Sequence, residues 1–152
     1  MPDQGDLNAT LSYWKEHREQ LRQSEGQRAV MTNYILVIAA GISGFVVQQH
    51  FAVRTIPLSL LTSLIGTYGA LVAAKYHERA DYHLSQARAL TAVLVKSGHL
   101  ADHQDVLDTY REAHYSKYPR LSKIRLYWLW VGLNLGIALY GFTLLAISLA
   151  IL

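Results

Sequence analysis

Histidine is the side chain in this sequence with the widest range of chemistry, and five of the seven histidines lie between residues 75 and 118. His99 and His103 are four residues apart, with Asp102 and Asp105 close by. Imidazole and carboxylate groups are common zinc ligands. However, the spacing matches no defined zinc motif, and the chain has no cysteine that could add a thiolate. We therefore expect these histidines to be solvated, with neither a metal ion nor another cofactor.

A second candidate for chemistry is the pair Arg79 and His83, which lie one helical turn apart. Such pairs resemble those in the ribonuclease sites of HEPN-type helical domains, where arginine and histidine act on the scissile phosphate. In that family the two residues usually stand further apart, and Arg111 and His114 fit the pattern less well. The alternative is that these side chains pair within a helical bundle. A membrane-tethered ribonuclease is therefore kept only as the third hypothesis.

No further catalytic motif is found in the sequence, which contains no Gly-rich phosphate loop, no GxSxG elbow and no HExxH motif. We therefore expect the chain not to be an enzyme. The net charge of +3 is modest, and the basic residues lie beside apolar runs. This distribution argues against direct binding of nucleic acid.

The elements that must position these residues include three apolar runs without a charged side chain, at residues 29–52, 55–74 and 126–152. All 14 Lys and Arg residues and all 11 Asp and Glu residues lie outside them. A helix of about 20 apolar residues crosses the roughly 30 Å of hydrocarbon in a bilayer. The sequence therefore predicts an all-α integral membrane protein, with three transmembrane helices, cytoplasmic helical extensions and the lipid bilayer as its main partner.

Four segments are predicted: 1–28, a cytoplasmic amphipathic helix; 29–74, a transmembrane hairpin; 75–119, a cytoplasmic helical segment; and 120–152, the last transmembrane helix. Gly26 either bends the join between the first two segments or lies within one continuous helix. The second span could continue as one helix of about 40 residues to a stop at Gly98. A loop is expected at 99–104, followed by a short helix over 105–118 that Pro119 ends.

The distribution of Lys and Arg predicts the orientation of the spans. The N-terminal segment carries four of these residues, the hairpin loop carries only Arg54, and residues 75–125 carry nine. We therefore expect a multi-pass protein with its N-terminus and central segment in the cytoplasm and its C-terminus outside.

Small and polar residues recur at helical spacing in the three spans, and small residues let membrane helices approach closely. The candidates for helix packing or for a pore are Gly44, Ser59, Ser63, Thr67, Gly132, Asn134 and Gly136. In one interpretation, these residues pack the three helices of one chain together. In the other, they pack one subunit against another, and the stripe formed by Ser59, Ser63 and Thr67 lies near a water path. No span carries a charged side chain, which argues against ion-coupled transport.

Apolar and aromatic residues on the cytoplasmic helices form a candidate assembly surface. Its members are Trp14, Leu21, Tyr76, His83 and Leu90. A pore would require several copies, because three spans cannot enclose a conducting path.

The segment KYHERADYHLSQARALTAVL at residues 75–94 follows directly on a two-span hairpin. This order resembles the SLATT group of small bacterial membrane proteins, whose motif positions would be filled by Tyr76, Glu78, Tyr82, His83, Ala87 and Leu90. The aromatic and basic segment from Tyr13 to Arg28 is also similar, so the resemblance covers roughly residues 10–97. The third span departs from the two-span pattern of that group.

The resemblance implies an effector of bacterial conflict or antiphage systems, located in the inner membrane and triggered by a cytoplasmic sensor protein or a nucleotide signal. Our leading hypothesis is a homo-oligomeric effector that forms a pore or permeabilises the membrane. The alternative is a membrane anchor or scaffold for a soluble partner that conducts nothing.

Overall fold

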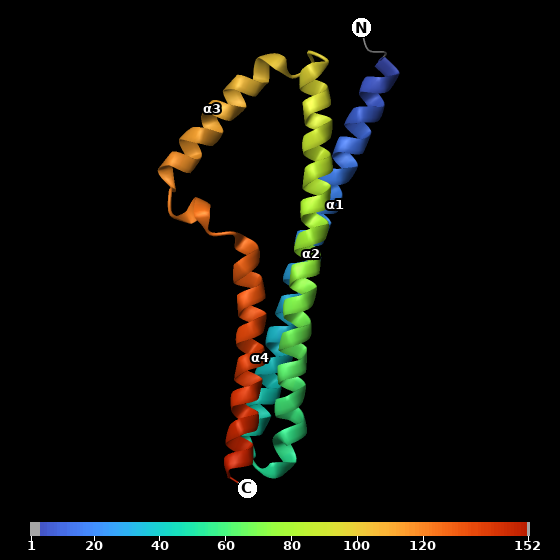
Figure 1. Ribbon diagram of the computed structural model, residues 1–152. Coiled ribbons are helices and arrows are strands. Elements are labelled where there is room, and N and C mark those ends of the chain that lie inside the picture. Colours follow the sequence, from blue (N-terminus) through green and yellow to red (C-terminus); the bar gives the residue numbers. More distant parts are fainter. Residues whose placement is uncertain (1–3, 152) are drawn as a thin grey trace. The chain divides into compact units, whose positions relative to one another are not determined.

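The computed structural model describes residues 4–151, and for residues 101–104 it describes the backbone alone. Four α-helices follow one another: α1 (Gln4–Gln48), α2 (Ile56–Lys96), α3 (Ala101–Lys117) and α4 (Leu126–Ala150) (Figure 1). Short 3-10 turns, η1 (Val53–Thr55) and η2 (Leu121–Lys123), precede α2 and α4. The residues described contain no β-strand, so the prediction of an all-α fold is confirmed.

Three of the helices are long and apolar enough to cross a membrane, namely α1, α2 together with η1, and α4. They contain most of each of the three apolar runs seen in the sequence. The prediction of three helices of transmembrane length is therefore confirmed.

Both long helices continue past the ends of their apolar runs. α1 has 45 residues and passes through Gly26 without a break, which decides between the two alternatives for that join. A glycine inside a helix costs about 1 kcal/mol relative to alanine. The flanking helical turns on both sides offset this cost. α2 has 41 residues and is one continuous helix, as predicted.

Gly98 ends α2, as predicted, in the left-handed conformation that glycine favours, with φ of 84°. The amide of Gly98 donates to the carbonyl of Val95 at 3.0 Å, and that of His99 donates to the carbonyl of Leu94 at 3.1 Å. This is the Schellman arrangement.

The predicted loop at 99–104 is wrong, because α3 already begins at Ala101. The stop at Gly98 needs no residue beyond His99, so the chain can re-enter a helix at once. The sequence also supplies Asp102 for the first turn of α3, where acidic residues are favoured. Pro119 follows the end of α3 at Lys117, as predicted.

The chain divides into two compact units, and α1 and α2 contribute to both of them. Unit 1 contains the chain up to Glu25 together with Glu78–Arg125, and unit 2 contains Gly26–His77 together with the chain from Leu126 onward. The chain passes from one unit to the other after residues 25, 77 and 125. These borders lie a few residues from the predicted segment borders, which come after residues 28, 74 and 119.

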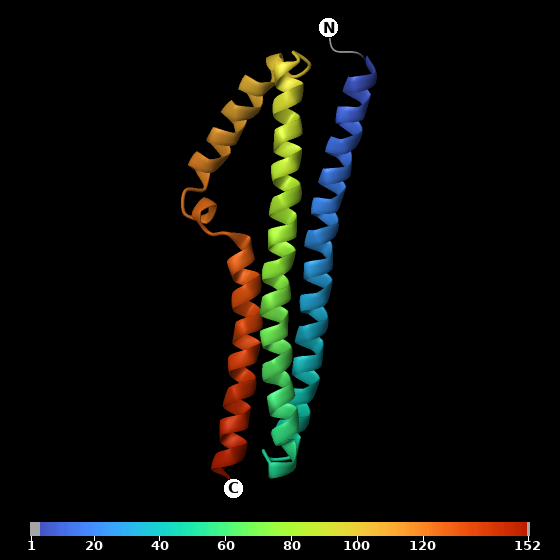
Figure 2. The same cartoon turned by 45° about the vertical axis from the view of Figure 1, so that its right-hand side comes forward.

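In unit 2, the C-terminal half of α1, the N-terminal half of α2 and the whole of α4 lie side by side (Figures 1 and 2). Ile35, Ala39 and Ile137 form a small buried apolar cluster. Most other buried side chains of this unit are small or carry a hydroxyl group, whereas leucine, valine and aromatic side chains are exposed on its surface. This distribution reverses that of a soluble protein, where large apolar side chains fill the core.

Candidate functional site

Three inward-facing glycines, Gly66, Gly69 and Gly141, let the helices of unit 2 approach one another closely. A Cβ atom at Gly66 would collide with the backbone of Ala138, and one at Gly141 would lie 2.5 Å from the backbone nitrogen of Ser63. At Gly69 it would collide with the side-chain oxygen of Asn134. No side chain fits at these three positions, so they fix the distances between α2 and α4.

The predicted Ser59 and Ser63 lie on the same buried face of α2 and are almost completely covered. Each hydroxyl donates to the backbone carbonyl four residues earlier, at 3.3 Å. Thr55, the last residue of η1, also reaches Ser148 of α4, with 3.4 Å between the two hydroxyl oxygens. The structure thus places most of the predicted Ser/Thr stripe inside one chain, although Thr67 is exposed.

Asn134 is completely buried on α4, where its amide nitrogen donates to the carbonyl of Trp130 at 2.9 Å. Its Oδ1 atom has no hydrogen-bond partner within the described residues, and the same holds for Thr32 Oγ1 and Trp130 Nε1. The guanidinium of Arg28 lies over the Trp130 ring, 5.5 Å from its centroid. Reading the sequence did not single out Arg28 or Thr32, although they stand one helical turn apart on a single face of α1.

The other predicted glycines, Gly44, Gly132 and Gly136, face outward. All three are exposed, and a Cβ atom at any of them would have nothing within 4 Å. The spacing that suggested close packing is therefore not used for packing within the chain.

Gly132 and Gly136 instead border an open groove between α1 and α4, with a volume of about 600 Å³. The groove is lined by small and apolar residues: Leu36, Ala39, Ala40, Ser43, Gly132, Leu133, Gly136, Ile137 and Tyr140. Small residues at the bottom of a groove allow another helix to come close to the backbone. Gly44 is not among the lining residues.

In unit 1, polar side chains join α1 to α2 at three levels. Trp14 Nε1 donates to Thr91 Oγ1 at 3.0 Å, and the Nδ1 atoms of His17 and His83 lie 3.0 Å apart. Arg79 donates to the side-chain oxygen of Gln20 at 3.2 Å. The histidine contact requires one ring to donate and the other to accept, so it cannot form when both rings are protonated.

The pKa of His83 is lowered from the ordinary value of 6.5. Burial is the largest cause, because it disfavours the charged ring, and the positive charges of His17 and Arg79 act in the same direction. Glu16 opposes the shift. The geometry therefore favours a neutral His83.

The predicted assembly residues are half-buried within the chain, as Trp14, Leu21, Tyr76, His83 and Leu90 all are. The polar atoms of Trp14 and His83 already contact the opposite helix of unit 1. Contact of these residues with a second copy remains a prediction.

A seven-residue repeat runs through α2 and was missed in the sequence. Its members are all buried: Ser59, Gly66, Ala73, Ala80, Ala87 and Leu94. A strict seven-residue period keeps one face of a helix toward a partner helix, as in coiled coils. Five of the six residues are small, and this signal could have identified the packing face from the sequence.

The candidates for chemistry do not form a recognisable reaction centre in the described residues. Arg79 contacts Gln20 of α1, and His83 contacts His17 of the same helix. His99 contacts the Ser97 hydroxyl at 2.8 Å, and the side chains of Asp102 and His103 lie outside the described part of the structure. No group of three or more potential metal ligands occurs among the described residues.

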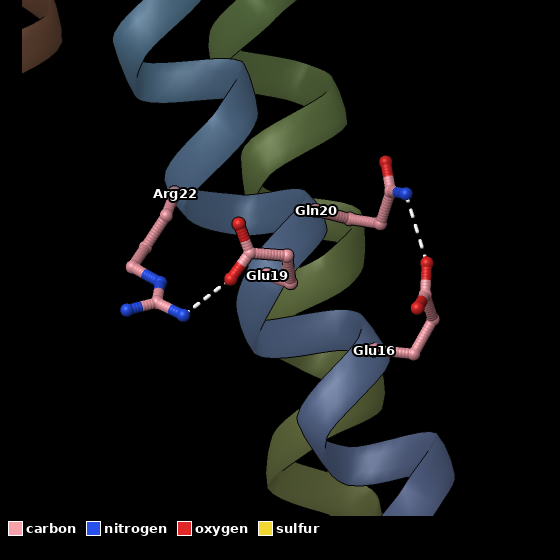
Figure 3. A network of polar contacts seen from close by, with 4 residues as sticks. All are labelled: Glu16, Glu19, Gln20 and Arg22. Carbon is pink, nitrogen blue, oxygen red and sulfur yellow. Dashed lines mark hydrogen bonds and ion pairs between the residues drawn. The ribbon is translucent and has the colours of Figure 1, made fainter.

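On the exposed side of α1, two polar contacts run along the helix. Glu16 accepts a hydrogen bond from Gln20 at 2.9 Å, and Glu19 pairs with Arg22 (Figure 3). Contacts of this kind add little to stability, because both partners are well solvated.

Comparison of the chain with protein-family models, with curated proteins and with solved structures finds no match.

Proposed function

We propose that this chain is a three-span integral membrane protein that assembles with copies of itself and permeabilises the bacterial inner membrane as an effector of a conflict or antiphage system. The observation that carries the proposal is the open groove between α1 and α4, floored by Gly132 and Gly136.

Insertion is supported by the distribution of side chains in unit 2. Large apolar side chains such as Leu64, Leu71 and Leu139 are 58%, 67% and 67% exposed, whereas polar side chains such as Ser63 and Asn134 are buried. In water this surface would promote aggregation, whereas in lipid it contacts a solvent of matching polarity. The excess of Lys and Arg in residues 75–125 places the N-terminus and this segment in the cytoplasm under the proposal.

Assembly is supported by the contrast between the inward and outward glycines. Gly66, Gly69 and Gly141 are needed within the chain, but Gly132 and Gly136 have open space around them. A second copy could fill this space, with the exposed leucines of its α2 entering the groove. A contact between two different surfaces repeats from copy to copy and closes into a ring when the rotation permits.

Permeabilisation rests on the ring and on the resemblance of residues 10–97 to SLATT proteins. One chain fills its own interior with small side chains, so a conducting path requires several copies. Unit 1 lies on the cytoplasmic side in this proposal and is where a sensor protein or nucleotide signal would act.

The test compares Gly136→Leu with Gly41→Leu. Both glycines are exposed with nothing within 4 Å of a Cβ atom, but only Gly136 lines the groove. Filling the groove should raise the dissociation constant of the oligomer by about 5-fold to 150-fold, since overpacking costs about 1–3 kcal/mol. The measurements are the mass of the solubilised particle and the membrane potential of cells that express each variant.

Wild-type protein and Gly41→Leu should form the oligomer and depolarise cells, whereas Gly136→Leu at the same protein concentration should form less oligomer and depolarise cells less. A monomeric wild-type particle would overturn the proposal. A normal membrane potential together with a co-purifying soluble protein would instead favour the scaffold alternative.

A further inference from the structure

Helix α3 presents an apolar face that no other part of the described chain covers. Leu107, Tyr110 and Leu121 are 63%, 74% and 65% exposed. Leu107, Tyr110 and His114 follow one another at intervals of three or four residues, so they share one face of the helix. The ring of Tyr118, just beyond the end of α3, lies 5.3 Å from the ring of His114. A shallow groove of about 320 Å³, lined by His114, Tyr115, Tyr118, Leu121 and Ser122, continues this face.

The opposite face of α3 is acidic. Asp105, Asp108 and Glu112 succeed one another at the same helical spacing, and Asp108 pairs with Arg111 at 3.0 Å. Helices that lie in a membrane interface oppose an apolar face to a charged face rich in Lys and Arg. In this chain the face opposite the apolar one is acidic, and the basic residues follow at the end of α3 and after it.

The end of α3 and the segment that leads to α4 are basic, in contrast to the acidic face of α3. Lys117, Arg120, Lys123 and Arg125 are exposed, and the sequence contains no acidic residue after Glu112. Juxtamembrane basic clusters of this type are attracted to anionic lipid headgroups. The ammonium of Lys117 also lies over the Tyr118 ring, 5.7 Å from its centroid, which keeps the cation beside the aromatic face.

Chain length limits how far this face can be from a bilayer. Residues 118–125 are all that separates α3 from α4, and eight residues span at most about 28 Å when fully extended. If α4 crosses the membrane, as proposed above, its first residue lies at the lipid surface. The C-terminal end of α3 is then within reach of that surface.

We propose that α3 and the basic segment after it bind the surface of an anionic phospholipid bilayer, with the Leu107–Tyr110–His114–Tyr118 face in the interface and the acidic face toward water. This inference rests on the proposed membrane insertion of α4. It gives unit 1 a second attachment to the membrane, through its own side chains.

The test uses the full chain in vesicles, and the absence of native cysteine allows single labelling sites. A polarity-sensitive fluorophore is attached to Tyr110→Cys, to Glu112→Cys on the opposite face, and to Leu139→Cys on α4. The vesicles contain phosphatidylcholine alone or phosphatidylcholine with phosphatidylglycerol. The Tyr110 label should lie about 5–10 Å below the headgroup surface, and its emission should shift to the blue on addition of phosphatidylglycerol.

The Glu112 label should stay in water in both lipids, and the Leu139 label should stay in hydrocarbon in both. Replacing Arg120 and Lys123 together by glutamine (R120Q/K123Q) should abolish the response of the Tyr110 label. A water-exposed Tyr110 label beside a lipid-buried Leu139 label overturns this inference alone. A water-exposed Leu139 label overturns membrane insertion and this inference together. Protection of the Tyr110 label that depends on protein concentration, and not on lipid charge, would assign the face to a second copy and also overturn the inference.

Discussion

The same two helices, α1 and α2, are joined in two different ways in the two units. In unit 2 the contacts depend on glycine and small residues, and Gly69 leaves no room for a Cβ atom beside Ile35 of α1. In unit 1 they depend on side chains that reach across, as Trp14 reaches Thr91 and His17 reaches His83. In unit 2 the side chain of Ile35 fits against a glycine of α2, whereas hydrogen bonds between side chains join the two helices in unit 1.

This difference agrees with the solvents proposed for the two units. Lipid provides no hydrophobic drive for helices to associate, so close van der Waals packing between small residues is the main source of stability there. In water, half-buried polar pairs and aromatic rings can hold two helices together and can also respond to pH. The seven-residue repeat of α2 runs through both units, so the packing face is the same while the chemistry at its borders changes.

The largest effect is expected from Gly66→Leu in unit 2. The new side chain must displace the backbone of Ala138, so we expect a loss of more than about 3 kcal/mol in the free energy of unfolding. The measurement is unfolding of the purified protein in detergent. Gly41→Leu, at an exposed glycine of α1, is the matched control and should change the stability by less than about 1 kcal/mol. Equal stability of the two variants would contradict the inward packing of Gly66.

A smaller effect is expected from acidification, and only in unit 1. The pKa of His83 is lowered below 6.5 in the folded chain, whereas it returns to 6.5 when α1 and α2 separate. At a pH between these two pKa values, the separated state therefore binds more protons than the folded state. The free energy that holds α1 to α2 should therefore be fully present above 6.5 and should fall as the pH drops below it. His17 and Glu16 face His83 from α1, and Arg79 lies one turn away on α2.

Hydrogen exchange measures this response. After correction for intrinsic rates, amides around Trp14 and Thr91 should lose protection between about pH 7.5 and about pH 5.5, while those around Ala73 should not. His83→Gln should reduce the difference in protection that is measured between these two pH values. An unchanged pH response in this variant would assign the effect to another group.

The smallest effect is expected from Arg22→Ala on the exposed side of α1. Within the part of the chain that the structure describes, Arg22 pairs with Glu19, one turn away in the same helix, and both side chains are well exposed (Figure 3). The substitution should change the free energy of unfolding by less than about 0.5 kcal/mol. A larger loss, measured by the same detergent unfolding, would indicate that this side of unit 1 contacts something other than water.

Much of the fold could be predicted because it depends on local patterns. The apolar runs gave the three long helices, and Gly98 and Pro119 marked helix ends through their own backbone geometry. The start of α3 was missed because the stop at Gly98 takes fewer residues than the loop that was expected. The seven-residue repeat of small residues was readable in the sequence and would have indicated the packing face of α2.

The candidate site depended more on tertiary structure. Gly132 and Gly136 have the same spacing signal as a packing motif, yet they face outward, while Gly66, Gly69 and Gly141 are the glycines that pack within the chain. Spacing along a helix tells which residues share a face but not what that face meets. His17 and His83 are 66 residues apart, so only the pairing of α1 with α2 brings them together.

The sequence by itself determined that this chain is helical, which of its helices are long and apolar, and where several of them end. These properties follow from hydropathy and from backbone preferences that each residue carries alone. Only the tertiary structure decided which small residues are covered, which leave an open groove, and which histidines meet. Those outcomes depend on contacts between helices, and no residue carries that information without its partner.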